Sequence, residues 1–129
     1  MTAFSDYLEN ELLDHTLGGL AYSSPAAVYV GLATSSFADD NSGTGEISGG
    51  AYARKAASFA AASSGSCSTD TTITWDTATA DWGTITHFGI FDASTAGNLL
   101  YHGALTASKV ISNGDTFEIT SGNLTISLD

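Results

Sequence analysis

The chain has 129 residues, which is enough for one domain with its own hydrophobic core. Only 3 residues are Lys or Arg against 14 Asp and Glu, so the formal net charge is −11 at pH 7. Phosphate groups and anionic lipids are bound mainly by Lys and Arg, so this balance argues against direct binding of nucleic acid or of a membrane surface. The apolar runs are far shorter than the ~20 residues that cross a bilayer, and the N-terminus lacks the pattern of a signal peptide. We therefore expect synthesis in a cytoplasm.

The first predicted element is a helix over residues 2–17, within an N-terminal helical segment of residues 1–19. Acidic side chains fall mostly on one face, Thr2 or Ser5 can cap the start, and Gly18-Gly19 can end the helix. Apolar side chains recur at spacings of three and four and share the other face: Phe4, Tyr7, Leu8, Leu12 and Leu13. This helix either packs on the rest of the domain or reaches a neighbouring molecule.

After Pro25 the pattern changes to short runs of β-forming residues. A polar, Gly-rich segment at residues 35–50 is predicted to be a long surface loop. Strands are predicted at residues 26–34, 52–61, 71–75, 83–92, 98–105, 109–111, 116–120 and 124–128. Roughly seven or eight short strands at this spacing are typical of an antiparallel β-sandwich or jelly roll. The sequence therefore predicts a mainly β single domain over residues 1–129, with the sandwich over residues 26–129.

The best-defined unit is the hairpin WGTITHFGIFDASTAGNLLYHGAL, residues 82–105. Two runs rich in Thr, Ile, Leu and aromatic residues flank the small residues of 93–97, where Gly97 can adopt a positive φ at no steric cost. Towards the C-terminus the alternation places Leu124, Ile126 and Leu128 on the inner face of a strand.

A few carboxylates in the long loop were weighed as calcium ligands. Asp39, Asp40 and Asn41, with Glu46 nearby, could supply oxygen atoms to Ca²⁺. Their spacing does not match the EF-hand pattern, so the solvated loop is the preferred interpretation.

The histidines and the single cysteine were weighed for metal binding and catalysis. His87 and His102 lie on the two arms of the hairpin, with Asp92 near its turn, and two such imidazoles could bind a transition metal. Imidazoles hydrogen-bonded to the backbone or to Thr are preferred. Cys67 lies in a Ser/Gly run and is predicted to be a loop thiol, because no base or orienting partner for a nucleophile is evident.

Aromatic residues suggest a further class, a carbohydrate-binding module. A sugar platform could form from Trp75, Trp82, Tyr101, Tyr52 and Phe91, although aromatics at strand ends are more often core or interface anchors. Asn123-Leu124-Thr125 fits the glycosylation pattern, but nothing points to a secreted host protein. No nucleotide-binding, hydrolase or metalloprotease motif is present. We therefore predict no catalytic, cofactor-binding or metal-ligating residue and no cofactor, and expect a protein that is not an enzyme.

The hairpin motif together with KVISNGDTFEITSGNLTISLD resembles a family of small virion proteins of tailed bacteriophages, commonly labelled tail-fibre or structural proteins. The segments FSDYLENELLDH and GGAYARKAASF are similar to the same family, so the resemblance covers nearly the whole chain. It implies a non-enzymatic structural protein of the virion, made in the cytoplasm of the bacterial host.

Two positions in the virion compete. A capsid decoration, or cement, protein that binds the major capsid protein is preferred, because the chain has neither the repeats nor the heptads of a long fibre. A tail or tail-fibre module that contacts other virion proteins or a receptor is the alternative. In either position we expect a symmetric homo-oligomer.

Overall fold

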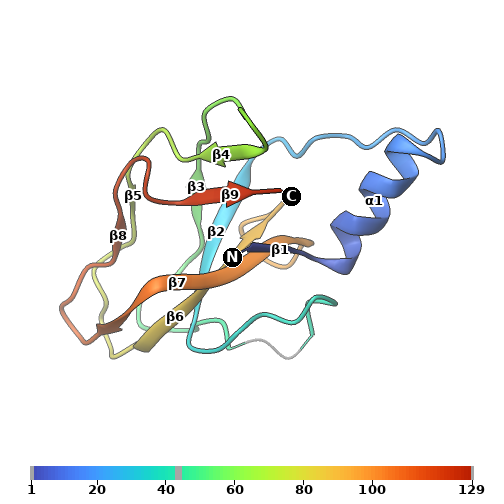
Figure 1. The fold of residues 1–129 in the computed structure, drawn as a ribbon. Coiled ribbons are helices and arrows are strands. Elements are labelled where there is room, and N and C mark those ends of the chain that lie inside the picture. Colours follow the sequence, from blue (N-terminus) through green and yellow to red (C-terminus); the bar gives the residue numbers. More distant parts are fainter. Residues whose placement is uncertain (1, 43–44, 129) are drawn as a thin grey trace.

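The computed structural model describes residues 2–42 and 45–128 (Figure 1). In this part of the chain the fold is mainly β with one helix, and the paired strands are antiparallel, as predicted. In chain order the elements are β1 (Thr2–Phe4), α1 (Asp6–Thr16), β2 (Val28–Ala33), β3 (Lys55–Ala57), β4 (Ser66–Ser68), β5 (Ile73–Thr74), β6 (Gly83–Phe91), β7 (Leu99–Ile111), β8 (Glu118–Ile119) and β9 (Thr125–Ser127).

The predicted hairpin forms the centre of a five-stranded sheet with the order β1-β7-β6-β2-β3. The turn between β6 and β7 is held by Asp92, whose carboxylate accepts hydrogen bonds from the backbone N–H and the side-chain amide of Asn98, at 2.7 and 2.9 Å. Gly97 has a φ of +73°, the left-handed conformation that its position in the turn requires. The hairpin prediction is confirmed, and Asp92 stabilises the turn through its hydrogen bonds to Asn98.

Two smaller sheets, β4-β9 and β5-β8, share the main core with the five-stranded sheet. Phe117 and Ile119 are buried on one side, and so are Leu124 and Ile126, as the alternation predicts. Leu128 was expected to point inwards, but it is 46% exposed, because it follows the last residue of β9. The expectation of a sandwich or jelly roll stays a prediction.

The N-terminal helix is shorter than predicted. Instead of residues 2–17 or 1–19, it spans Asp6–Thr16, and Thr2–Phe4 form β1. These three residues pair with Tyr101–Gly103 on the outer edge of β7. Ser5 then caps the helix, because its hydroxyl oxygen accepts the backbone N–H of Leu8 at 3.2 Å. Local propensity favours a helix for residues 2–4, but they form β1 because the edge of β7 offers them backbone hydrogen bonds.

Other strand boundaries also differ from the prediction. Residues 109–111 are not a separate strand, because β7 continues to Ile111, which pairs with Gly83. The Ser/Gly run predicted as a loop contains β4, and Cys67 in it pairs with Ile126 of β9. The predicted strand 52–61 is reduced to β3, followed by an isolated bridge between Phe59 and Thr69.

The segment 35–50 is only partly a surface loop, as far as its described residues go. Phe37 is 3% exposed and packs edge-on against Phe91. Ile47 joins the main core, and its backbone N–H donates to Leu32 in β2 at 3.0 Å. These apolar side chains anchor the segment on the sheet, while Asp39, Asp40 and their neighbours are exposed.

Candidate interaction surfaces

Arg54 lies at the centre of a mostly buried polar network beside the β6–β7 turn. Its guanidinium makes a bidentate ion pair with Glu46, with Nε to Oε2 and Nη2 to Oε1 both at 2.8 Å. Nη1 donates to the carbonyl oxygens of Ala96 at 2.8 Å and Ala93 at 3.2 Å, and Cζ lies 3.4 Å from the centroid of the Phe91 ring. The side chains of Arg54 and Glu46 are 10% and 18% exposed. Arg54, just before β3, therefore links the β6–β7 turn to Glu46 through hydrogen bonds.

Tyr52 extends this network towards β2. Its hydroxyl donates to Oε2 of Glu46 at 2.8 Å and accepts the backbone N–H of Leu32 at 2.9 Å. Burial raises the pKa of Tyr52 far above its usual value, and the neighbouring carboxylate of Glu46 adds to this shift. No motif in the sequence pointed to this network. The available signal was Arg54, one of only three basic residues in the chain, within a predicted strand.

The predicted calcium-ligand candidates are held by separate partners. Glu46 pairs with Arg54, whereas Oδ1 of Asp39 lies 2.5 Å from Nε2 of His102. Asp40 accepts hydrogen bonds from Ser42, which lower its pKa. Within residues 2–42 and 45–128, no group of three or more His, Cys, Asp or Glu side chains is placed to hold a metal ion.

The two hairpin histidines also have different partners. Nδ1 of His87 lies 2.7 Å from Oγ1 of Thr86, while His102 contacts the carboxylate of Asp39. The expected pairing of an imidazole with Thr therefore holds for His87. Cys67 was predicted to be a loop thiol, but it lies within β4, and its Sγ donates to the carbonyl oxygen of Ala60 at 2.9 Å.

The aromatic residues considered for a sugar platform belong to the core or its margin. Trp75 and Phe91 are 1% and 0% exposed, and Trp82 is 6% exposed with its Nε1–H donating to the carbonyl oxygen of Gly50. Tyr52 and Tyr101 are half-buried. Ring faces in these positions are covered by protein, so they stabilise the core instead of forming a flat exposed platform.

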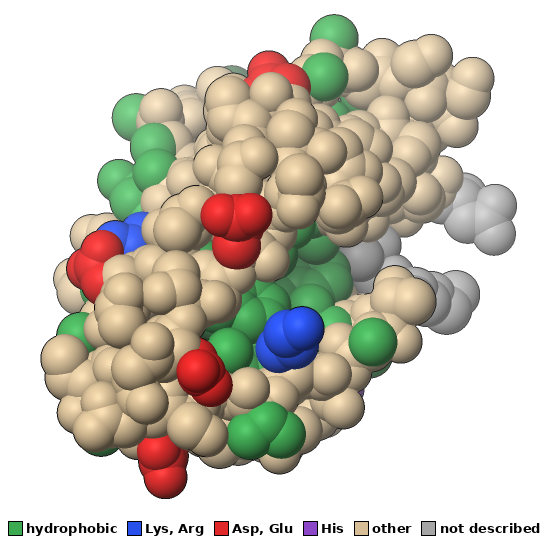
Figure 2. All heavy atoms as spheres, turned by 90° about the vertical axis from the view of Figure 1, so that its left-hand side faces the viewer, with side chains coloured by type: hydrophobic (Ala, Val, Ile, Leu, Met, Phe, Trp, Pro, Cys, Tyr) green, Lys and Arg blue, Asp and Glu red, His purple; other side chains and the backbone are tan. Residues whose placement is uncertain are grey.

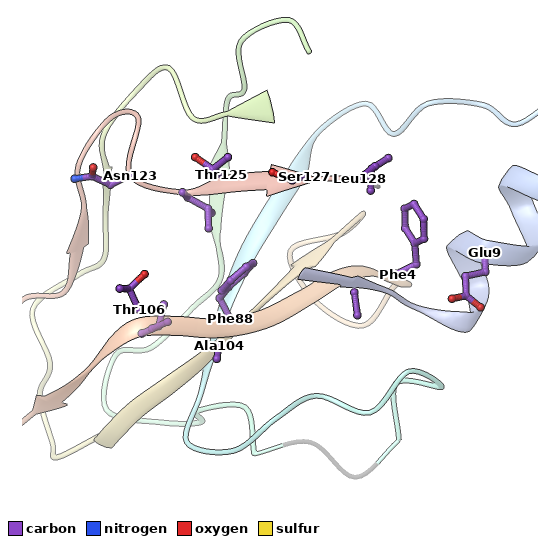
Figure 3. A pocket seen from close by; sticks show the side chains of 12 residues that line it. Phe4, Glu9, Phe88, Ala104, Thr106, Asn123, Thr125, Ser127 and Leu128 are labelled. Atoms are coloured by element: carbon purple, nitrogen blue, oxygen red, sulfur yellow. The ribbon is translucent and has the colours of Figure 1, made fainter. Parts of the chain in front are cut away.

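A groove of about 820 Å³ separates β9 from β1 and β7 (Figure 3). Phe4 and Leu128 lie towards its helix end, with Glu9 of α1 close by, and Thr106 and Asn123 lie towards its other end. β1 pairs with β7 only along Tyr101–Gly103, so the rest of that edge of β7 has no strand beside it among the described residues. An edge of this kind offers backbone hydrogen-bonding groups to an incoming strand.

Apolar surface is also accessible elsewhere. Figure 2, which views the side that lies at the left in Figure 1, shows hydrophobic side chains lining a hollow, with a basic side chain beside it and single acidic side chains around it. A smaller apolar pocket of about 290 Å³, open to solvent, lies between the large sheet and β4-β9 and is lined by Val28, Phe59, Cys67, Ile90, Leu100, Tyr101 and Ile126. Burial raises the pKa of Tyr101 at its edge.

Helix α1 stands beside the sheets and is anchored mainly by its first turn (Figure 1). Leu8 is the buried apolar residue of α1, whereas Leu13 is 55% exposed. Leu17 and Leu20, at and after the helix end, are 81% and 61% exposed. The helix therefore packs on the domain through Leu8 and leaves the side chains at its end exposed. No helix in the described part of the chain is long and apolar enough to cross a membrane.

Together these features define a β-rich domain with an open strand edge on β7, a groove beside β9 and exposed leucines at the end of α1. The family model described as "Podophage GP4 fiber I protein gp80" matches residues 3–127, and the chain belongs to this family. No curated protein matches the chain. The resemblance noted in the sequence is therefore confirmed: this is a structural protein of a phage virion, of a family named for a fibre protein.

Proposed function

We propose that this protein is a structural component of the tail fibre of a podophage virion and has no catalytic activity of its own. The observation that carries the proposal is the match to a fibre-protein family over residues 3–127. Because the match includes the sheets and α1 alike, it concerns the whole domain and not one shared motif.

The chemistry of the domain supports an assembly role. His102 and Glu46 are engaged with other side chains, and the bulky aromatic rings fill the core. The surfaces that remain available are the exposed leucines of α1, the groove beside β9 and the free edge of β7. The burial of Trp75 and Trp82 also removes the main support for a carbohydrate-binding module.

Capsid decoration is the second candidate, with the major capsid protein as partner. It is favoured by the absence from the sequence of repeats and of the heptads that build long fibre shafts.

The two positions are separated by locating the protein in intact particles with an antibody and electron microscopy. We expect label on the fibres. Label spread over the shell would reject the fibre role and favour capsid decoration, whereas particles without label would reject both.

We propose further that the protein forms a symmetric homo-oligomer through the open edge of β7. Val110 on this strand is 64% exposed, and two such edges can pair across a symmetry axis. Mass photometry of the purified protein should show an oligomer, and Val110→Lys should weaken it. A monomer at all concentrations would contradict the proposal.

A further inference from the structure

Exposed apolar side chains are concentrated on α1 and its end. Of the five large hydrophobic side chains exposed in the described part of the chain, three are Leu13, Leu17 and Leu20. Leu13 and Leu17 are four residues apart, so they lie on one face of the helix, and that face is opposite the buried Leu8. Scattered exposed leucines are ordinary, but a cluster on one face indicates a contact site.

The backbone keeps this cluster together beyond the end of the helix. Gly19 has a φ of +72°, which lets the chain turn back, and the backbone N–H of Leu20 donates to the carbonyl oxygen of Asp14 at 3.1 Å. Leu20 is therefore held against the last turn instead of following a free linker.

Acidic side chains flank the leucines along α1. Glu9 lies one turn before Leu13, and Asp14 lies one turn before Leu17; both are exposed, and the basic side chain of the last turn is His15. The first Lys or Arg in the chain is Arg54. The carboxyl end of a helix carries about half a negative charge of its own. An apolar ridge with acidic flanks complements a partner with apolar side chains between Lys and Arg residues.

We propose that this face of α1, made of Leu13, Leu17 and Leu20 with its acidic flanks, docks a basic amphipathic segment of another virion protein. A second copy of this chain is a poor complement. It would oppose acidic faces, and its Arg54 and Lys55 are already paired with Glu46 and Asp76. The remaining basic residue, Lys109, is a single exposed charge on β7 and makes no basic segment. The inference rests on the proposed structural role in the virion, but it does not depend on whether the protein lies on a fibre or on the shell.

The partner can be captured in assembled particles. A photo-crosslinking benzoylphenylalanine replaces Leu17 in phage, and the matched control carries it in place of Ala62, an exposed residue between β3 and β4 that neither lines the groove nor lies on α1. We expect Leu17 to give a crosslink to a Lys/Arg-rich segment of a different virion protein, identified by mass spectrometry. A crosslink to a second copy or to an acidic segment, or a yield no higher than at position 62, overturns the proposal.

Variant phage test both parts of the surface. Leu13→Ser with Leu17→Ser should lower the number of copies per particle about tenfold, which corresponds to about 1.4 kcal/mol, while Ala62→Ser, at an exposed site between β3 and β4, leaves it unchanged. Asp14→Lys should also lower it, whereas Asp70→Lys, the same charge change at another exposed site, should not.

Circular dichroism of each purified variant verifies that the fold is kept, which is expected because every substituted side chain is exposed. Normal copy numbers in both α1 variants would overturn the docking surface. Antibody labelling of the same particles reports separately on the proposed location.

Discussion

Replacement of Arg54 tests whether its ion pair is what holds the β6–β7 turn in place. In Arg54→Ala, the carboxylate of Glu46 keeps the hydroxyl of Tyr52 but loses both guanidinium hydrogen bonds. The carbonyl oxygens of Ala93 and Ala96 lose their side-chain donor as well. The variant thus removes the Arg54 counter-charge from a mostly buried carboxylate.

The expected loss follows from the exposure of the two side chains. At 10% and 18% exposure the pair belongs with buried salt bridges, for which removal of one partner costs about 3–5 kcal/mol. The lost contact with the Phe91 ring adds about 0.5–2 kcal/mol, an amount that overlaps with the first and is not fully additive. We therefore expect Arg54→Ala to lower the free energy of unfolding by about 3–5 kcal/mol, a large part of the total for a domain of this size.

Urea denaturation followed by tryptophan fluorescence measures this loss, since Trp75 and Trp82 are both buried. The matched control is Lys55→Ala, which removes the same charge from an adjacent residue whose partner Asp76 is 68% exposed. An exposed pair contributes about 0–1 kcal/mol, so the control should stay near wild type. A double-mutant cycle with Glu46→Gln should show strong coupling. A loss below about 1 kcal/mol in Arg54→Ala would refute the buried-pair reasoning.

Three further predictions concern backbone, cap and pH. Gly97→Ala should lower the free energy of unfolding by about 2 kcal/mol or more, because an added Cβ would lie 2.6 Å from Oδ1 of Asp92. Ala96→Gly should raise it by about 0.5–1 kcal/mol, because Ala96 has a φ of +52°, which glycine adopts without strain. Thermal unfolding measures both, and equal effects would contradict the argument. Ser5→Ala should lower the free energy of unfolding measured in urea by about 1–2 kcal/mol, because the backbone N–H of Leu8 and the carbonyl oxygen of Leu99 lose the Ser5 hydroxyl. An unchanged urea midpoint would refute the capping role of Ser5. Because the pKa of Tyr52 is raised in the folded protein, its contribution to the free energy of unfolding is complete below pH 10.0, the pKa of an unperturbed tyrosine. Above pH 10.0 the unfolded chain ionises more readily than the folded protein, so this contribution falls by about 1.4 kcal/mol per pH unit. In Tyr52→Phe, the slope of the free energy of unfolding against pH above pH 10.0 should decrease by the equivalent of one proton. An unchanged slope would exclude Tyr52 as a cause of the alkaline loss of stability.

The parts of the fold that depend on neighbouring residues were predictable from the sequence. Alternation in the last segments placed Phe117 and Ile119 in the core, because side chains in a strand point to opposite faces in turn. The β6–β7 turn followed from its small residues and from Gly97, whose positive φ needs no tertiary contact to explain it. The class of protein was equally accessible, because the motifs of the chain are those of one phage family.

The parts that depend on distant residues were not predictable. The Ser/Gly run around Cys67 has no strand pattern of its own and becomes β4 because β9, far along the chain, offers it an edge. Thr2–Phe4 likewise become β1 because β7 has an unpaired edge beside them. The pairing of Arg54 with Glu46 depends on how the long loop returns to the sheet.

The sequence by itself thus determined a mainly β, acidic domain with an N-terminal helix, since periodicity, turn chemistry and charge are local or compositional properties. Only the tertiary structure decided which apolar faces the domain covers itself. The prediction that Leu8 and Leu13 share one apolar face is wrong, because five residues of helix put them on nearly opposite sides of α1. Which of these sides is buried depends on what the sheet places against it. The sheet covers Leu8 and leaves Leu13 and Leu17 exposed, and this difference turns the end of α1 into a contact surface.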